Sequence, residues 1–359
     1  MSDTTDFTGT RPVAQAHAFD VGRLQDYMRE HVDGYSGTLD VAQFKGGQSN
    51  PTFLLKAGGE TYVMRRKPPG VLLPSAHAID REYRVISALA KTDVPVAQAF
   101  ALCEDSEVIG TAFYIMEYVD GRVLWDPALP DTTRSERGAI YDEMNRVMAA
   151  LHSVDPIAIG LADYGKPGNY IERQVARWTK QYRAAETERI EAADHLIEWL
   201  PKYIPSDDES RIVHGDYRLD NVILDRDSPR IRAVLDWELS TLGHPLVDFA
   251  YHCLAWRMKP GEFRGLAGVD IATLGIPDEA NYVKTYLART GRDASAVSDV
   301  DWGYFLVFNM FRLVGILQGI TARALQGNAS SAQALESGKR TAPLAARAWA
   351  LACEVDAMR

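Results

Sequence analysis

Cysteine and histidine are scarce in this sequence, and neither is arranged as a disulfide or metal site. The three cysteines, Cys103, Cys253 and Cys353, are odd in number and form no C-x-x-C pair, so neither a disulfide framework nor a cysteine zinc site is supported. The eight histidines include no pair at ligand spacing with a third partner, which argues against a histidine metal site. We therefore expect a protein of a reducing, cytoplasmic compartment.

Long apolar runs and an excess of positive charge are also lacking. The first six residues contain neither the basic nor the apolar segment of a signal peptide. No stretch approaches 18 uncharged apolar residues, the length needed to span a membrane. Lys and Arg number 39 against 49 Asp and Glu, for a net charge of -10, whereas binding to duplex nucleic acid needs a basic surface. Secretion, membrane insertion and nucleic-acid binding are therefore not expected.

The composition that is present is ordinary for a globular protein, and its pattern changes along the chain. The 359 residues, 46% of them hydrophobic, exceed a typical domain of about 100 to 150 residues and predict two lobes. A polar arm comes first, followed by a short helix over residues 20–30 that Asp20 would cap. Alternating apolar residues then predict antiparallel strands, with one helix among them over residues 75–90 that Ser75 would cap. The predicted strands cover residues 38–44, 52–56, 61–65, 97–103 and 111–116.

Beyond Tyr118 the pattern becomes mainly helical, because apolar residues recur at helical spacing. The predicted helices cover residues 135–152, 170–185, 190–200, 245–256, 278–290, 301–326 and 331–355. Two short strand-like runs, over residues 222–224 and 231–235, interrupt them. The chain is therefore predicted to be α+β, with a small antiparallel sheet in the first lobe and a larger, mainly helical second lobe.

One motif carries most of the chemical information. Residues 214–221 read H-G-D-x-x-x-x-N, and an apolar strand follows directly. In phosphoryl transfer, a carboxylate such as that of Asp216 accepts the proton of the substrate hydroxyl, and an amide oxygen such as that of Asn221 holds a metal ion. A second acidic group, which would bind the metal ion, is expected at the end of the next hairpin, where Asp236 stands. The pattern predicts a phosphotransferase.

With these motifs the sequence resembles the aminoglycoside phosphotransferase and choline kinase group, over about residues 35–330. Within that group it resembles most the kinase-like domains fused to acyl-CoA dehydrogenases. The finer resemblance rests on the segments RRKPPG at residues 65–70, LPSAH at 73–77 and WELSTLGHPLVD at 237–248.

The resemblance implies a protein-kinase-like bilobal fold that binds ATP, with GTP as the alternative, together with Mg²⁺. An arm and short helix would occupy residues 1–34, and a nucleotide-binding N-lobe residues 35–118. The helical C-lobe, with the catalytic loop and the acceptor site, would occupy residues 119–359.

The resemblance also implies roles for residues of the second lobe. Asp216 would be the catalytic base, and Asn221 and Asp236 the metal ligands. Asp248 resembles a carboxylate that braces the catalytic loop in this group, and His214 would support the same loop.

In the first lobe, phosphoryl transfer needs a cation on the third strand, paired with a carboxylate from a helix. Arg65 ends that strand and Glu82 lies on the predicted helix. Arg can bind phosphate bidentately, whereas Lys acts as a point charge. Arg66 and Lys67 remain alternatives, because side chains alternate between the two faces of a strand.

Two further segments resemble nucleotide-binding parts of the group. The turn that would cover the phosphates with backbone N–H groups contains Gly46, Gly47, Ser49 and Asn50. The connector between the lobes contains Glu117 and Val119, whose backbone groups would contact an adenine edge.

The acceptor side is predicted less sharply. The tryptophans of the helical lobe, Trp302 among them, belong by default to its core. The alternative is that Trp302, together with Asn309 and Arg312, lines the acceptor pocket. Arg218 stands beside the catalytic motif and, with Arg81 and Arg84, could attract an anionic acceptor.

We thus expect an ATP- and Mg²⁺-dependent phosphotransferase acting on a hydroxyl of a small molecule. The branch implies a hydroxyacyl-CoA acceptor and an acyl-CoA dehydrogenase as functional partner. Aminoglycoside, choline or other amino-alcohol acceptors are the alternative. A catalytically silent kinase-like binding module is a second alternative. It predicts the loss of at least one of Asp216, Asn221, Asp236 or the strand cation, and all four are present.

Overall fold

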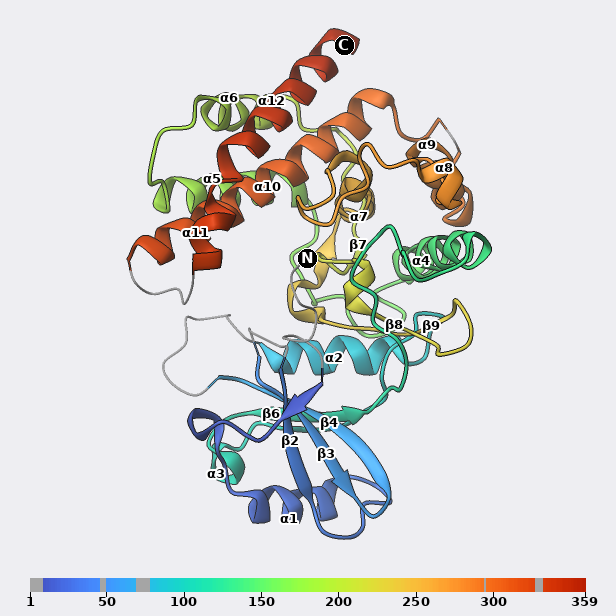
Figure 1. Cartoon of the computed structure of the whole chain (residues 1–359), viewed down its shortest axis with the longest axis vertical. Helices are drawn as coiled ribbons and strands as arrows, with labels where there is room; N and C mark the ends of the chain where they lie inside the picture. The colour runs from blue at the N-terminus through green and yellow to red at the C-terminus, as the bar shows by residue number, and fades with distance from the viewer. Residues whose placement is uncertain (1–8, 46–49, 69–77, 294, 327–331) are drawn as a thin grey trace. The chain divides into compact units, whose positions relative to one another are not determined.

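A computed structural model of the chain describes residues 9–45, 50–68, 78–293, 295–326 and 332–359. The chain divides into two compact units, each built from three segments (Figure 1). Unit 1 comprises Met1–Val123, Ile157–Leu161 and Asn221–Ser240, and unit 2 comprises Leu124–Pro156, Ala162–Asp220 and Thr241–Arg359. After residue 123 the chain re-enters unit 1 over residues 157–161 and again over residues 221–240. The two units therefore differ from the single boundary between residues 118 and 119 that was expected from the sequence.

Unit 1 is built on an antiparallel sheet in the order β1-β2-β3-β4-β6-β5. Its strands are β1 (Thr10–Arg11), β2 (Asp40–Phe44), β3 (Thr52–Ala57), β4 (Glu60–Arg66), β5 (Ala99–Cys103) and β6 (Phe113–Glu117). In β3, Phe53, Leu55 and Ala57 are buried and Lys56 is exposed. This is the period-two pattern of a strand with one face on a core.

Helices α1 (Val21–His31), α2 (Ile79–Leu89) and α3 (Ser106–Ile109) accompany this sheet. The side chain of Asp20 accepts a hydrogen bond from Arg23 N and caps α1, as predicted. Leu24 and Met28 of α1 join the core of the sheet with Phe53, so the N-terminal segment is part of unit 1. The hairpin of β8 (Val222–Leu224) and β9 (Ile231–Val234), followed by the 3-10 turn η5 (Trp237–Leu239), also belongs to unit 1.

Unit 2 is mainly helical. Its helices are α4 (Arg134–Ser153), α5 (Tyr170–Ala184), α6 (Glu191–Trp199), α7 (Pro245–Arg257), α8 (Ile271–Leu274), α9 (Glu279–Arg289), α10 (Asp299–Leu325), α11 (Ala332–Gly338) and α12 (Thr341–Met358). A two-stranded sheet pairs β7 (Arg211–Val213) with β10 (Thr241–Gly243). The antiparallel sheet of unit 1 and the helices of unit 2 confirm the predicted α+β class.

Helix α10 forms the centre of unit 2, packing on α12, α7, α5 and α11 (Figure 1). By length and composition alone it could cross a membrane, but 72% of its most apolar window is buried inside the protein. A helix that is apolar nearly all round is the expected core helix of a large helical unit.

Several element boundaries differ from the predictions. Helix α2 begins after Ala78, which provides no side-chain cap, and Ser75 lies outside the described residues. The helix expected over residues 331–355 is two helices, α11 and α12. Helix α3 lies between the strands expected over residues 97–103 and 111–116, and β1 lies in the segment expected to be a polar arm.

Candidate functional site

A cluster of charged side chains in unit 1 centres on Arg65 of β4. Arg65 Nε lies 3.1 Å from Glu82 Oε2 on α2, and Arg65 Nη2 lies 3.1 Å from Asp236 Oδ1. The predicted pair of a strand cation and a helix carboxylate is therefore present. The structure also adds a contact that the sequence analysis did not anticipate, because Arg65 bridges Glu82 and Asp236.

The alternation of side chains along β4 separates Arg65 from its basic neighbours. Arg66 points to the other face, where Nη2 donates to His17 O over 3.0 Å and the guanidinium packs on the rings of Phe19 and Phe53. Lys67 Nζ pairs with Asp80 at 3.7 Å. Of the three basic residues left open by the sequence, Arg65 is the one that meets Glu82.

Glu82 is only 1% exposed, and polar groups surround it. Tyr114 Oη donates to Oε2 over 3.0 Å and Asn50 Nδ2 donates to Oε1 over 2.8 Å. Burial raises the pKa of Glu82, although the Arg65 guanidinium opposes that shift. For Arg65, burial alone would lower the pKa, but the negative charges around it raise the pKa overall.

Asn50 is thus a buried partner of Glu82. The other predicted members of the phosphate-covering turn, Gly46, Gly47 and Ser49, lie outside the described residues. In the connector, Glu117 N donates to Gln98 O over 2.8 Å, so an adenine contact at Glu117 could use only its carbonyl group. Val119 is buried.

Asn221 and Asp236 are brought together by the β8–β9 hairpin, because Leu235 N donates to Asn221 O over 2.8 Å. Asp236 adopts a left-handed backbone conformation with φ of 64° and its side chain is 35% exposed. An amide oxygen and a carboxylate are hard donors that suit Mg²⁺. Among the described residues no group of three or more His, Cys, Asp or Glu could hold a metal. Water and phosphate oxygens, which Mg²⁺ usually keeps, would complete the coordination.

In unit 2, the Asp248 side chain forms hydrogen bonds with the loop that carries Asp216. The Asp248 carboxylate, at the start of α7, accepts hydrogen bonds from His214 N at 2.7 Å and from Gly215 N at 2.9 Å. Gly215 has a φ of 83°, which favours glycine. Burial alone would raise the pKa of Asp248, but its hydrogen bonds with His152 and the loop lower it.

Two buried histidines, His152 and His214, make further hydrogen bonds around Asp248 and the loop. His152 Nε2 lies 3.2 Å from Asp248 Oδ2, and His152 Nδ1 lies 2.6 Å from Tyr286 Oη. His214 is fully buried, and its Nδ1 accepts a hydrogen bond from Asp216 N over 3.1 Å. These buried partners fix the backbone on both sides of Gly215.

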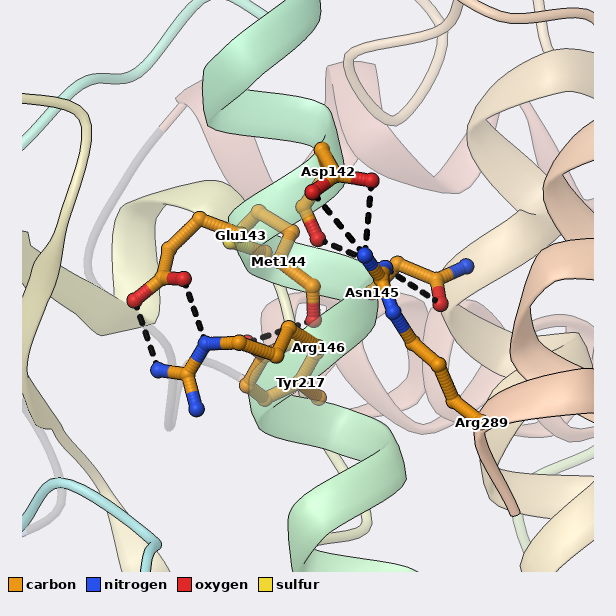
Figure 2. A network of polar contacts seen from close by, with 7 residues as sticks. All are labelled: Asp142, Glu143, Met144, Asn145, Arg146, Tyr217 and Arg289. Atoms are coloured by element: carbon orange, nitrogen blue, oxygen red, sulfur yellow. Dashed lines mark hydrogen bonds and ion pairs between the residues drawn. The ribbon is translucent and has the colours of Figure 1, made fainter. Parts of the chain in front are cut away.

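Helix α4 also contacts the loop that carries Asp216 (Figure 2). Tyr217, the residue after Asp216, donates from Oη to Met144 O over 3.1 Å. Arg289 at the end of α9 bonds both carboxylate oxygens of Asp142 and also Asn145 Oδ1. Helix α4 thus hydrogen-bonds to the segment after Asp216, and Arg289 links α4 to α9.

Tyr251 contacts Asp216 directly and was not found from the sequence. Its Oη donates to Asp216 Oδ1 over 2.5 Å, and burial and the Asp216 carboxylate both raise the pKa of Tyr251. Tyr251 stands three residues after Asp248 on α7, on the same helix face. The three-residue spacing from Asp248 is the feature of the sequence that could have indicated this contact. Arg218 also pairs with Asp216, with its Nε 3.2 Å from Oδ1.

Four of the six residues named for the acceptor side lie in unit 2 and divide into two pairs. Arg312 Nη2 donates to Gly215 O over 2.6 Å, so Arg312, like Arg218, contacts the Asp216 loop. Asn309 is fully buried and donates from Nδ2 to Val247 O and Phe305 O. It ties α10 to α7. Trp302 Nε1 donates to Glu279 on α9.

The chain is similar to a known protein family and to several curated proteins. The chain matches the Phosphotransferase enzyme family over residues 40–294. It is 46% identical over 345 residues to mouse acyl-CoA dehydrogenase family member 10, covering 95% of this chain and 32% of the relative. It is 42% identical over 350 residues to mouse acyl-CoA dehydrogenase family member 11, covering 95% and 44%. The chain therefore spans less than half the length of these curated relatives.

Solved structures show the same relationship. A candidate aminoglycoside phosphotransferase from Ralstonia eutropha JMP134 is 59% identical, with a TM-score of 0.87, covering 94% of this chain and 99% of that one. A thermostable mutant of aminoglycoside phosphotransferase APH(4)-Ia, in a ternary complex with ADP and hygromycin B, is 16% identical with a TM-score of 0.58, covering 91% and 97%. The second likeness shows the fold alone.

Proposed function

Because the chain belongs to the phosphotransferase enzyme family, we propose that it is an ATP- and Mg²⁺-dependent kinase that phosphorylates a hydroxyl group of a small molecule. The observation that carries this proposal is the double ion pair of Arg65 with Glu82 and Asp236. Phosphoryl transfer in this fold uses a strand cation that is held by a helix carboxylate and lies next to the metal-binding carboxylate.

In the proposed reaction, unit 1 serves the nucleotide. The Arg65 guanidinium would bind phosphate oxygens, with Glu82 holding it in place, and Asn221 and Asp236 would hold Mg²⁺. A bound Mg²⁺ would neutralise charge that develops on the phosphate oxygens. The ion pair with Arg65 uses one side of the Asp236 carboxylate, and a carboxylate has further lone pairs with which it could bind a cation.

Asp216, in unit 2, would orient the acceptor hydroxyl and accept its proton. The hydrogen bond from Tyr251 and the ion pair with Arg218 restrict the Asp216 carboxylate, and the contacts of Asp248 restrict its backbone. Catalysis by positioning depends on such restriction, because a misplaced base contributes little to the transition state.

For the acceptor we propose a hydroxyacyl-CoA, with an acyl-CoA dehydrogenase acting on a later product. The names of the mouse relatives support this proposal, and so do the arginines beside Asp216, because they suit an anionic molecule better than a cationic antibiotic. The name of the Ralstonia protein supports the alternative, an aminoglycoside or another amino alcohol.

The proposal is tested by measuring ADP release and phosphorylated product with a panel of acceptors. We expect Mg²⁺-dependent transfer to a hydroxyacyl-CoA and none to the matching acyl-CoA without the hydroxyl. Transfer to choline or aminoglycosides alone would replace the acceptor assignment. ATP binding without transfer to any hydroxyl compound would instead indicate a silent binding module.

A further inference from the structure

Arg312 is a charged residue in the middle of the apolar helix α10. Most residues around it on this helix are buried and hydrophobic, whereas Arg312 itself is partly exposed. Its Nη2 donates to Gly215 O, one residue before Asp216. A cation is costly to place in such surroundings unless it has a partner or a ligand.

The charge of Arg312 has no carboxylate partner within the described part of the chain, in contrast to its neighbours. Arg218 pairs with Asp216 and Asp220, and Arg264 also pairs with Asp220. Arg312 Nε is buried and makes no hydrogen bond to any described residue. A guanidinium has five N–H donors, and the contact with Gly215 uses one of them.

Aromatic rings hold the Arg312 guanidinium in place. It lies 5.7 Å from the ring centre of Trp178 on α5 and 4.8 Å from that of Tyr251 on α7. Trp178 can approach α10 closely because residue 315 is glycine, where an added Cβ would lie 3.3 Å from the indole. The cation thus has three contacts, with the Gly215 carbonyl group and with two aromatic rings.

A second arginine uses the same indole. The Arg177 guanidinium lies 5.6 Å from the centre of the Trp178 ring, and no carboxylate pairs with Arg177 among the residues that the structure describes. Two unpaired cations therefore share one tryptophan, next to the loop of Asp216. An anion bound beside the indole would be attracted by both charges.

From these contacts we propose that Arg312, with Arg177 and Trp178, forms a binding site for an anionic oxygen group of the acceptor, a phosphate or a carboxylate. The inference rests on the proposed function. Tyr251 links this site to the reaction, because its ring packs on Arg312 and its hydroxyl bonds Asp216. Acceptors would carry both a hydroxyl and an anionic group, which makes polycationic aminoglycosides and choline poor substrates.

The test compares three acceptors that differ in charge: a hydroxyacyl-CoA, the matching hydroxyacyl-pantetheine without phosphates, and the free hydroxy acid. A charge-assisted hydrogen bond contributes about 1.5 to 3 kcal/mol, so Arg312→Gln should lower kcat/KM about 10- to 150-fold for the acceptor whose anion binds here. The KM for ATP should not change. If kcat/KM of Arg312→Gln falls only with the CoA ester, the group bound at this site is a phosphate. If kcat/KM falls with the free hydroxy acid, the bound group is a carboxylate.

Controls distinguish binding from structural support. Arg323→Gln removes an exposed arginine from the same helix and should leave all acceptors unaffected. Arg177→Gln, on the exposed face of α5, should give a smaller loss with the same acceptor preference. An equal loss for charged and neutral acceptors in Arg312→Gln would overturn the proposal, since a merely structural arginine predicts that result.

Calorimetric titration with the same three compounds separates this inference from the proposed function. If the wild type binds a charged acceptor and Arg312→Gln does not, the anion site stands even where no phosphate is transferred, and only the proposed function fails. If the wild type transfers phosphate but Arg312→Gln binds every compound as the wild type does, the anion site fails alone. Absence of any difference in binding between charged and neutral compounds in the wild type also overturns it.

Discussion

Replacing Tyr251 with phenylalanine tests whether the hydroxyl that contacts Asp216 takes part in turnover. Tyr251 is buried and donates to Asp216 Oδ1 over 2.5 Å, so the substitution removes one hydrogen bond and keeps the ring. A hydrogen bond to a charged group contributes about 1.5 to 3 kcal/mol. If that free energy holds the carboxylate for proton transfer, kcat falls by about 10- to 150-fold.

The assay is the steady-state rate at saturating ATP and acceptor, with the KM of each. We expect the loss in kcat, because the contact orients the base, and a KM for ATP within about twofold of the wild type. Tyr304→Phe is the matched control, since Tyr304 is also buried and donates to Leu200 O over 2.9 Å. A Tyr251→Phe enzyme with the turnover of the wild type, or no slower than Tyr304→Phe, would refute the reasoning.

Three further predictions concern charge in each unit. Glu82→Gln should weaken ATP binding about tenfold or more, because Arg65 loses its buried partner; calorimetry that shows an unchanged Kd would contradict this. Asp236→Ala should abolish the extra thermal stabilisation that Mg²⁺ adds to ATP, and a Tm increase equal to that of the wild type would argue against the ligand role. Burial lowers the pKa of His252 from 6.5 to about 4, so the unfolded chain takes up a proton first as the pH falls through 6.5. Stability should therefore drop by up to about 3 kcal/mol between pH 6.5 and 4, and urea unfolding of His252→Asn should show a shallower dependence over that range.

Local patterns in the sequence predicted most of the strands and the contacts that depend on them. Asp20 caps α1 as expected, because a cap depends only on neighbours a few residues away. The pair of Arg65 and Glu82 follows from placing one residue at a strand end and the other on the next helix. Strand alternation could not decide between Arg65 and Arg66 until the buried face of β4 was known.

The missed features depend on tertiary packing. Strands β7 and β10 pair with each other across a long stretch of sequence, so no hairpin turn marks them as it marks β8 and β9. For Asn309 the sequence left a pocket wall as one possibility, because α10 is apolar nearly all round and helical spacing could not show which face is buried. Tyr251 meets Asp216 only because Asp248, one turn earlier on α7, binds the loop.

The central claim is that Asp216 is the base of a phosphotransferase, and the most direct measurement is phosphate transfer from labelled ATP by Asp216→Asn. Asparagine keeps the size of the side chain but cannot accept the hydroxyl proton. We predict that the variant binds Mg-ATP like the wild type and loses acceptor-dependent transfer by at least about 100-fold. Full acceptor-dependent transfer by Asp216→Asn would contradict the account.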